Sequence, residues 1–148
     1  MDGAFDQRDG FIWMNGALIP WTDARVHVLT HGLHYASSVF EGERAYAGAI
    51  FKLREHTERL IYSAKELGFE IPYAASEIDA ACIETLEANG LVDGYLRPVA
   101  WRGSEMMGVS AQQPTHSEAA LTGISSSRLY TTTAADSKPK KRKLRVTP

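Results

Sequence analysis

Residues 43–68 read ERAYAGAIFKLREHTERLIYSAKELG, and this stretch decides the fold. Its first part predicts a hairpin of strands 43–46 and 49–53, because short apolar runs flank an Ala-Gly turn. In 54–67 apolar residues recur at the spacing of one helical face, and Gly68 stands where glycine commonly ends a helix. The stretch therefore predicts a hairpin followed directly by a helix.

Similar signals continue on both sides of this stretch. Residues 12–21, IWMNGALIPW, predict another hairpin, since an Asn-Gly pair tolerates the positive φ angles of a tight turn. Residues 76–89 begin with SEID, a passable capping box, and predict a second helix. Residues 95–101, YLRPVAW, predict a strand, in which Pro98 favours an edge position or a bulge. Strands, two helices and a strand predict an α+β domain with helices packed on a mostly antiparallel sheet.

The character of the sequence changes after Gln113. The segment PTHSEAALTGISSSRLYTTTAADS is rich in Ser, Thr and Ala and has few large apolar residues. Such a composition is typical of linkers and disordered segments. We therefore expect a folded domain at 1–112 and an irregular, poorly packed tail at 113–148.

The bulk composition is that of one soluble globular domain. The 148 residues are 44% hydrophobic and 23% charged, which leaves room for one ordinary domain. The first residues, MDGAFDQRDG, lack the positive charge and apolar run of a signal peptide. No stretch of the sequence is long and apolar enough to span a bilayer. We expect a cytoplasmic protein without a membrane partner.

Positive charge is concentrated near the end of the chain. Residues 138–145, KPKKRKLR, hold six of the sixteen Lys and Arg residues, whereas 1–137 carry all eighteen acidic groups. Such a run resembles a nuclear-localisation signal, and it can also bind nucleic acid or an anionic membrane. No aromatic residues interleave the lysines, so nucleic acid is an unlikely partner. We favour a solvated tail, and keep as the alternative function a non-catalytic interaction or targeting protein.

Three histidines and one cysteine are the other candidates for chemistry. His27, His31 and His34 could hold a metal only if their segment were helical, and Gly32 argues against a helix there. We expect loop histidines with local hydrogen bonds and no metal site. Cys82 lies among apolar residues of the second predicted helix, so we expect a buried core residue rather than a nucleophile.

A family resemblance gives these elements a context. Residues 34–46, HYASSVFEGERAY, occur in register with IWMNG, REHTERL and YLRPVAWRGSEMMGVSAQ. Over about residues 11–112 these motifs resemble the branched-chain amino-acid aminotransferases of class IV, which depend on pyridoxal phosphate. The resemblance implies the small N-terminal domain of a fold-type IV enzyme, with two helices on an antiparallel sheet.

The resemblance assigns the cofactor phosphate to one arginine. The arginine of the family's EHxxRL segment binds that phosphate, and here it is Arg59. Its planar fork suits phosphate oxygens, and it keeps its charge at every physiological pH. From the residues alone, an exposed helical arginine paired with Glu55 is the simpler interpretation.

Four further residues are implied in substrate binding. The aromatic residues of the HYxxSVFEG motif, Tyr35 and Phe40, would line the pocket for the substrate side chain. Tyr95 and Arg97, from the Tyr-x-Arg-Pro segment, would face the substrate, and the arginine would recognise its carboxylate. From the residues alone, core packing is an equally simple interpretation for the aromatic pair, whereas an arginine such as Arg97 is most often an exposed residue at a strand edge.

The family's catalytic lysine, which forms a Schiff base with the cofactor, has no counterpart in this sequence. In the family it belongs to the larger C-terminal domain, and the lysines of the basic run at 138–143 match no family motif. We therefore assign no catalytic residue. The expectation is a truncated transaminase that retains no cofactor and is inactive alone. Intact relatives would form homo-oligomers such as dimers and transfer the amino group of Leu, Ile or Val to 2-oxoglutarate.

The abrupt departure at about Gln113 has three open explanations. A shifted reading frame, an alternative terminal exon or fusion, and an engineered tail would each replace the apolar strand that the family has after GVSAQ. A shifted frame fits the composition best, because such residues were not selected to pack.

Overall fold

The computed structural model describes residues 4–105 and 117–125. Two 3-10 helices, three α-helices and seven strands lie in these ranges. In chain order they are η1 (Phe5–Gln7), β1 (Phe11–Met14), β2 (Ala17–Pro20), η2 (Trp21–Asp23), α1 (His31–Tyr35), β3 (Ser38–Phe40), β4 (Glu43–Tyr46), β5 (Ala49–Ile50), α2 (Leu53–Glu66), α3 (Ala75–Ala88), β6 (Gly94–Arg102) and β7 (Ser117–Ser125).

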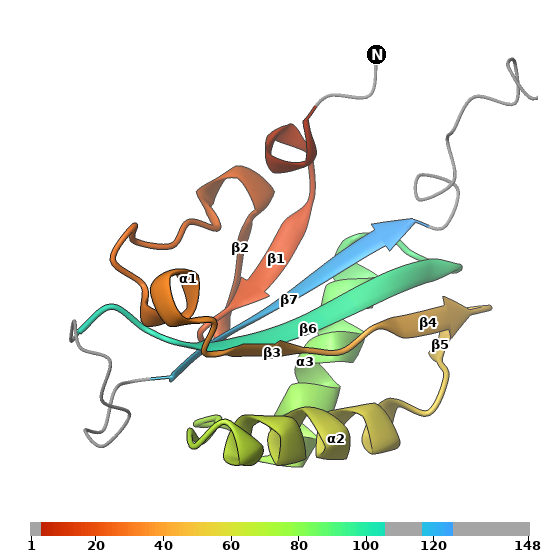
Figure 1. The fold of residues 1–148 in the computed structure, drawn as a ribbon. Coiled ribbons are helices and arrows are strands. Elements are labelled where there is room, and N and C mark those ends of the chain that lie inside the picture. The colour runs from red at the N-terminus through yellow and green to blue at the C-terminus, as the bar shows by residue number, and fades with distance from the viewer. Residues whose placement is uncertain (1–3, 106–116, 126–148) are drawn as a thin grey trace, which may run out of the picture.

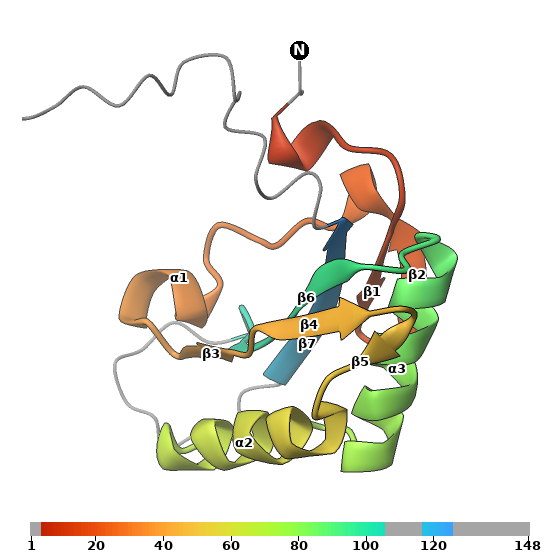
Figure 2. The same ribbon diagram turned by 90° about the vertical axis from the view of Figure 1, so that its right-hand side faces the viewer.

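All strands join one antiparallel sheet in the order β2-β1-β7-β6-β4-β5, and β3 also pairs with β6. Helices α2 and α3 lie together on one side of the sheet, and α1 lies on the other side (Figures 1 and 2). The predicted α+β class, an antiparallel sheet with two packed helices, is confirmed.

The main core fills the space between β6 and the two long helices. Alternate residues of β6 point toward the helices, and Leu96 and Ala100 are both fully buried there. Ala64 from α2 and Cys82 from α3 complete this layer with no exposed surface. The prediction that Cys82 is a buried core residue is therefore confirmed.

The two hairpin turns form at the positions predicted from the sequence. Asn15 and Ala47 adopt positive φ angles of 49° and 50°, and the glycine after each also has a positive φ. The second strand of the hairpin after Ala47 is shorter than expected, because β5 ends at Ile50. The start of α3 also differs, since Glu77 accepts from the backbone N–H of Ala74 at 2.7 Å and caps the helix two residues earlier than the SEID motif indicates.

The expected irregular tail is wrong for Ser117–Ser125, which form β7 between β1 and β6. Ala119 and Ala120 are buried on opposite faces of this strand. A Cβ added to Gly123 would lie 3.0 Å from Leu91 Cδ1, so a larger residue there would have to displace the Leu91 side chain. Ala and Gly are common in linkers, but they also suit a strand that is covered on both faces, as β7 is at Ala119 and Ala120. Residues 113–116 and 126–148 of the predicted tail lie outside the described residues.

Pro98 was expected at a strand edge or in a bulge, and both expectations are wrong. Its strand, β6, is an inner strand. The pairs Phe40–Val99 and Glu43–Leu96 on either side of the interruption are three residues apart in both strands, so no bulge is inserted. The Pro98 carbonyl accepts from Glu41 N–H at 2.9 Å, but proline has no N–H to return the bond. The partner strand is interrupted at that point, between β3 and β4. The missing donor is thus accommodated by a gap in the neighbouring strand, at Glu41.

The segment His31–Tyr35 forms a short helix, α1, where a loop was expected. Gly32 makes this possible because the helix lies close to β6. A Cβ at Gly32 would be 3.1 Å from the Cβ of Trp101. Glycine therefore serves here as a close-packing residue and not as a helix breaker.

Candidate functional site

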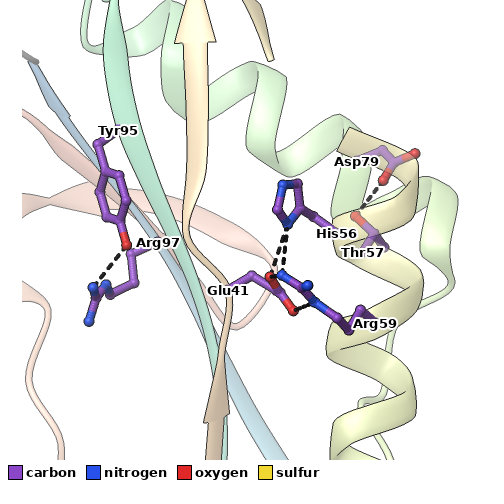
Figure 3. A network of polar contacts seen from close by, with 7 residues as sticks. All are labelled: Glu41, His56, Thr57, Arg59, Asp79, Tyr95 and Arg97. Carbon is purple, nitrogen blue, oxygen red and sulfur yellow. Dashed lines mark hydrogen bonds and ion pairs between the residues drawn. The ribbon is translucent and has the colours of Figure 1, made fainter. Parts of the chain in front are cut away.

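Arg59 on α2 faces the Glu41 carboxylate, which lies at the interruption between β3 and β4 (Figure 3). Arg59 Nε donates to Glu41 Oε1 at 2.6 Å, and Nη2 donates to Oε2 at 2.5 Å. The Arg59 side chain is 63% exposed, whereas that of Glu41 is only 5% exposed. The partner suggested by the residues alone, Glu55, lies instead 3.8 Å from Lys52.

His56 holds the same carboxylate from a second direction. His56 Nδ1 lies 2.9 Å from Glu41 Oε2, and its side chain is 20% exposed. An ionised carboxylate only accepts hydrogen bonds, so Nδ1 carries the proton in this contact. The 3.3 Å separation of Nδ1 from Arg59 Nη2 is then an approach of two donors and not a hydrogen bond.

Hydrogen bonding keeps the central carboxylate ionised. The hydrogen bond from Arg59 lowers the pKa of Glu41 below its ordinary value, burial opposes this shift, and His56 adds to it. The same contact with Glu41 raises the pKa of Arg59. The cluster therefore presents a permanently charged, partly exposed guanidinium, which suits binding of an anion.

A second group of polar and aromatic side chains lies on the other side of β6 (Figure 3). Arg97 Nη2 lies 2.8 Å from the Tyr95 hydroxyl. The guanidinium carbon of Arg97 is 4.5 Å from the centre of the Phe40 ring and 5.4 Å from that of Tyr95. Arg97 is thus held by an aromatic face on a solvent-accessible surface, where a cation–π contact orients it.

The structure brings three of the five predicted site residues together and leaves the other two, Arg59 and Tyr35, in separate places. Phe40, Tyr95 and Arg97 are in contact, and Arg59 lies across β6 from them. The ring of Tyr35 contacts His31 and His34 of its own helix, at centroid distances of 4.6 and 6.1 Å. His34 Nε2 also lies 2.8 Å from the Val28 carbonyl, a local hydrogen bond of the expected kind.

Sequence reasoning gave no role to Glu41, His56 or Glu43. Glu41 and His56 stand inside the quoted motifs, so the motifs themselves were the available signal. Glu43 is fully buried on the helix side of β4, and within residues 4–105 and 117–125 no nitrogen or oxygen donor reaches either of its oxygens. Burial, followed by the charges of Glu41 and Asp79, raises the pKa of Glu43 to about 7, against a smaller opposing effect of the Cys82 thiol.

An apolar cavity of about 320 Å³ opens on the sheet face that carries Arg97. Strands β1, β6 and β7 form its floor, and the segment from Ala24 to Leu33 forms its wall. Neither Arg59 nor Arg97 lines this cavity. The cavity is therefore a neighbour of the Arg97 group and is not part of either site. Among the described residues, no helix is both long and apolar enough to cross a membrane.

The fold and these motifs define a class of enzyme. The sequence profile described as "Amino-transferase class IV" matches residues 38–146, and this chain belongs to that family. It is 53% identical over 100 residues to the "Probable branched-chain-amino-acid aminotransferase" of Rickettsia typhi, covering 68% of this chain and 35% of that protein. The branched-chain-amino-acid aminotransferase of Pseudomonas aeruginosa is 48% identical over 108 residues, covering 70% of this chain and 35% of that protein. The chain thus spans about a third of the length of the curated relatives it matches.

Solved structures give the same likeness. The branched-chain amino acid aminotransferase of Escherichia coli superposes with a TM-score of 0.76 and 35% identity, over 80% of this chain and 41% of that chain. The enzyme of the same name from Thermobaculum terrenum superposes with a TM-score of 0.66 and 25% identity, over 79% of this chain and 40% of that chain. That second structure is the PLP form of its enzyme, in which PLP stands for pyridoxal phosphate.

Proposed function

We propose that this chain forms the small-domain side of a branched-chain amino-acid aminotransferase active site, with Arg59 binding the phosphate of pyridoxal phosphate. The observation that carries the proposal is the exposed guanidinium of Arg59, held in place by the nearly buried Glu41 carboxylate. Membership of the class IV aminotransferases supports it. Pyridoxal phosphate, when bound, supplies the electron sink that lets a proton leave the α carbon of an amino acid.

The donor set of Arg59 fits a phosphate group. A guanidinium has five N–H donors, and Glu41 takes only one from Nε and one from Nη2. The remaining donors lie on a side chain that is 63% exposed. A planar pair of donors matches two phosphate oxygens better than a point charge does.

The second group would serve the substrate. In this proposal Arg97 binds a substrate carboxylate, while the rings of Phe40 and Tyr95 fix the plane of its guanidinium. Phe40 is 59% exposed and Tyr35 is 41% exposed, so both offer apolar surface to a branched aliphatic side chain. The complete reaction, amino transfer from Leu, Ile or Val to 2-oxoglutarate by a homo-oligomer, belongs to a longer enzyme in this proposal.

We expect residues 1–148 alone to show no transaminase turnover. The described lysines, Lys52 and Lys65, are exposed at the two ends of α2, away from the protected site that a catalytic lysine requires. With pyridoxal phosphate, leucine and 2-oxoglutarate present, glutamate should form no faster than with free cofactor. Faster formation would show that the chain has its own proton-transferring group.

Arg59→Ala is expected to weaken binding of pyridoxamine 5'-phosphate on the order of tenfold, because one bidentate charged contact is lost. This ligand has no aldehyde, so it does not react with surface lysines. Arg59→Lys should restore only part of the affinity, since an ammonium cannot reproduce the fork. Affinity is measured by NMR titration, with Lys65→Ala as the control that removes one exposed charge from the same helix. Equal binding by the Arg59→Ala variant and the parent would refute the proposed function.

A further inference from the structure

The contact between Glu41 and Arg59 uses one particular edge of the guanidinium. Nε and Nη2 face the carboxylate, so both hydrogens of Nη1 and one hydrogen of Nη2 point elsewhere. This free Nη1/Nη2 edge is the end of the side chain, and the side chain is 63% exposed. An oxyanion can therefore bind end-on without displacing Glu41.

Glu41 is itself fixed, which makes it a rigid support. Its side chain is only 5% exposed, and its backbone N–H is bonded to the Pro98 carbonyl at 2.9 Å. His56 donates to its second oxygen at 2.9 Å. His56 and Arg59 both project from α2, which packs on β3 and β6. The sheet thus fixes the backbone of Glu41, and two side chains of α2, His56 and Arg59, hold its carboxylate oxygens.

We infer that Glu41 and His56 are positioning residues, which hold Arg59 so that its Nη1/Nη2 edge is ready for the phosphate of the cofactor. The inference rests on the proposed role of Arg59. A free arginine side chain must lose much conformational freedom when it binds a phosphate in one geometry. In this cluster that freedom is already lost before the anion arrives.

Two effects of Glu41 oppose each other, and their signs can be separated by experiment. Its negative charge repels a phosphate, while its hydrogen bonds orient the guanidinium. Solvent and salt screen the repulsion at a partly exposed site, whereas the loss of orientation is not screened. We therefore expect orientation to be the larger effect, so that removal of the negative charge weakens phosphate binding.

Glu41→Gln provides this test in the full 148-residue chain. The amide keeps the shape of the carboxylate, but its NH₂ group faces an arginine donor, and one support of Arg59 is lost. Titration with inorganic phosphate and with pyridoxamine 5'-phosphate, followed by NMR at pH 7.5, should show affinity reduced at least about threefold. The Arg59 Nε–H resonance should also lose its hydrogen-bonded shift. Unchanged or tighter binding would overturn the inference.

Two matched variants keep the result interpretable. Glu55→Gln removes the same charge from an exposed position on α2 that contacts Lys52 and not Arg59, so it should leave binding unchanged or slightly tighter. His56→Gln keeps Glu41 and should weaken binding less than Glu41→Gln does. An Arg59→Ala variant that binds like the parent would refute the proposed function itself. Loss of binding in Arg59→Ala without loss in Glu41→Gln would refute only the positioning role.

The folded state is checked separately, because Glu41 is nearly buried. Circular dichroism and urea unfolding of Glu41→Gln should show a folded chain under the titration conditions. If that variant is unfolded, His56→Gln decides the question, since His56 is more exposed. Parent-like phosphate affinity and a parent-like Arg59 Nε–H resonance in folded His56→Gln would then overturn the inference.

Discussion

Leu121→Ala is expected to destabilise the chain by about 2–5 kcal/mol, the range measured for truncation of buried leucines. Leu121 lies in the middle of β7 and is 2% exposed. It is opposite Pro98 on one side and Trp13 on the other. Its removal would leave a cavity in the core under α3. Because domains are commonly stable by only about 5–15 kcal/mol, such a loss is large.

This result would distinguish a packed strand from an unstructured tail. Val92→Ala is the control, because Val92 is 61% exposed and its truncation should change stability by less than about 0.5 kcal/mol. The measurement is urea unfolding of both variants and the parent. If Leu121→Ala unfolds at the same urea concentration as the parent, β7 does not contribute to the core.

Glu43→Gln is expected to make the chain more stable at pH 8, by up to about 3 kcal/mol. The pKa of Glu43 is about 7 in the folded chain, against an ordinary value of 4.5. Between these two values the folded chain binds more protons than the unfolded chain. Stability of the parent therefore falls as pH rises from about 4.5 to 7, and then levels off. An amide stays neutral and lacks this loss.

The comparison needs several pH values and a matched control. Urea unfolding at intervals from pH 4.5 to 8 should give curves for the parent and Glu43→Gln that separate with rising pH. Glu58→Gln removes a carboxylate from an exposed position on α2, so its curve should run parallel to that of the parent. A constant difference between Glu43→Gln and the parent would show that Glu43 does not titrate within the core.

Local features of this fold were predictable because local chemistry determines them. The Asn-Gly turn and Gly68 mark element ends through their backbone preferences, and Cys82 lies within an apolar helical face. The strand β7 was missed because burial between two neighbours and under a helix favours Ala and Gly, which also abound in linkers. Composition alone does not separate these two cases.

The polar site was less predictable, because its partners are distant in sequence. Arg59 has an acid at helical spacing, Glu55, yet it pairs with Glu41 across the gap opposite Pro98. That gap follows from the order of strands in the sheet, which local patterns do not contain. Glu43 stands in ERAY, where polar residues occur on both faces of the strand, so no alternation indicated which face is buried.

The position of β7 also affects the order in which the chain can fold. Strand β1 pairs with β2 beside it in sequence, but its other partner is β7, at the opposite end of the described chain. Ile12 can pair with Thr122 only after the helices and β6 have been synthesised. Such distant pairing raises the contact order and slows folding. During synthesis, the inner edge of β1 therefore stays open until β7 leaves the ribosome, and in that interval it can pair with other strands.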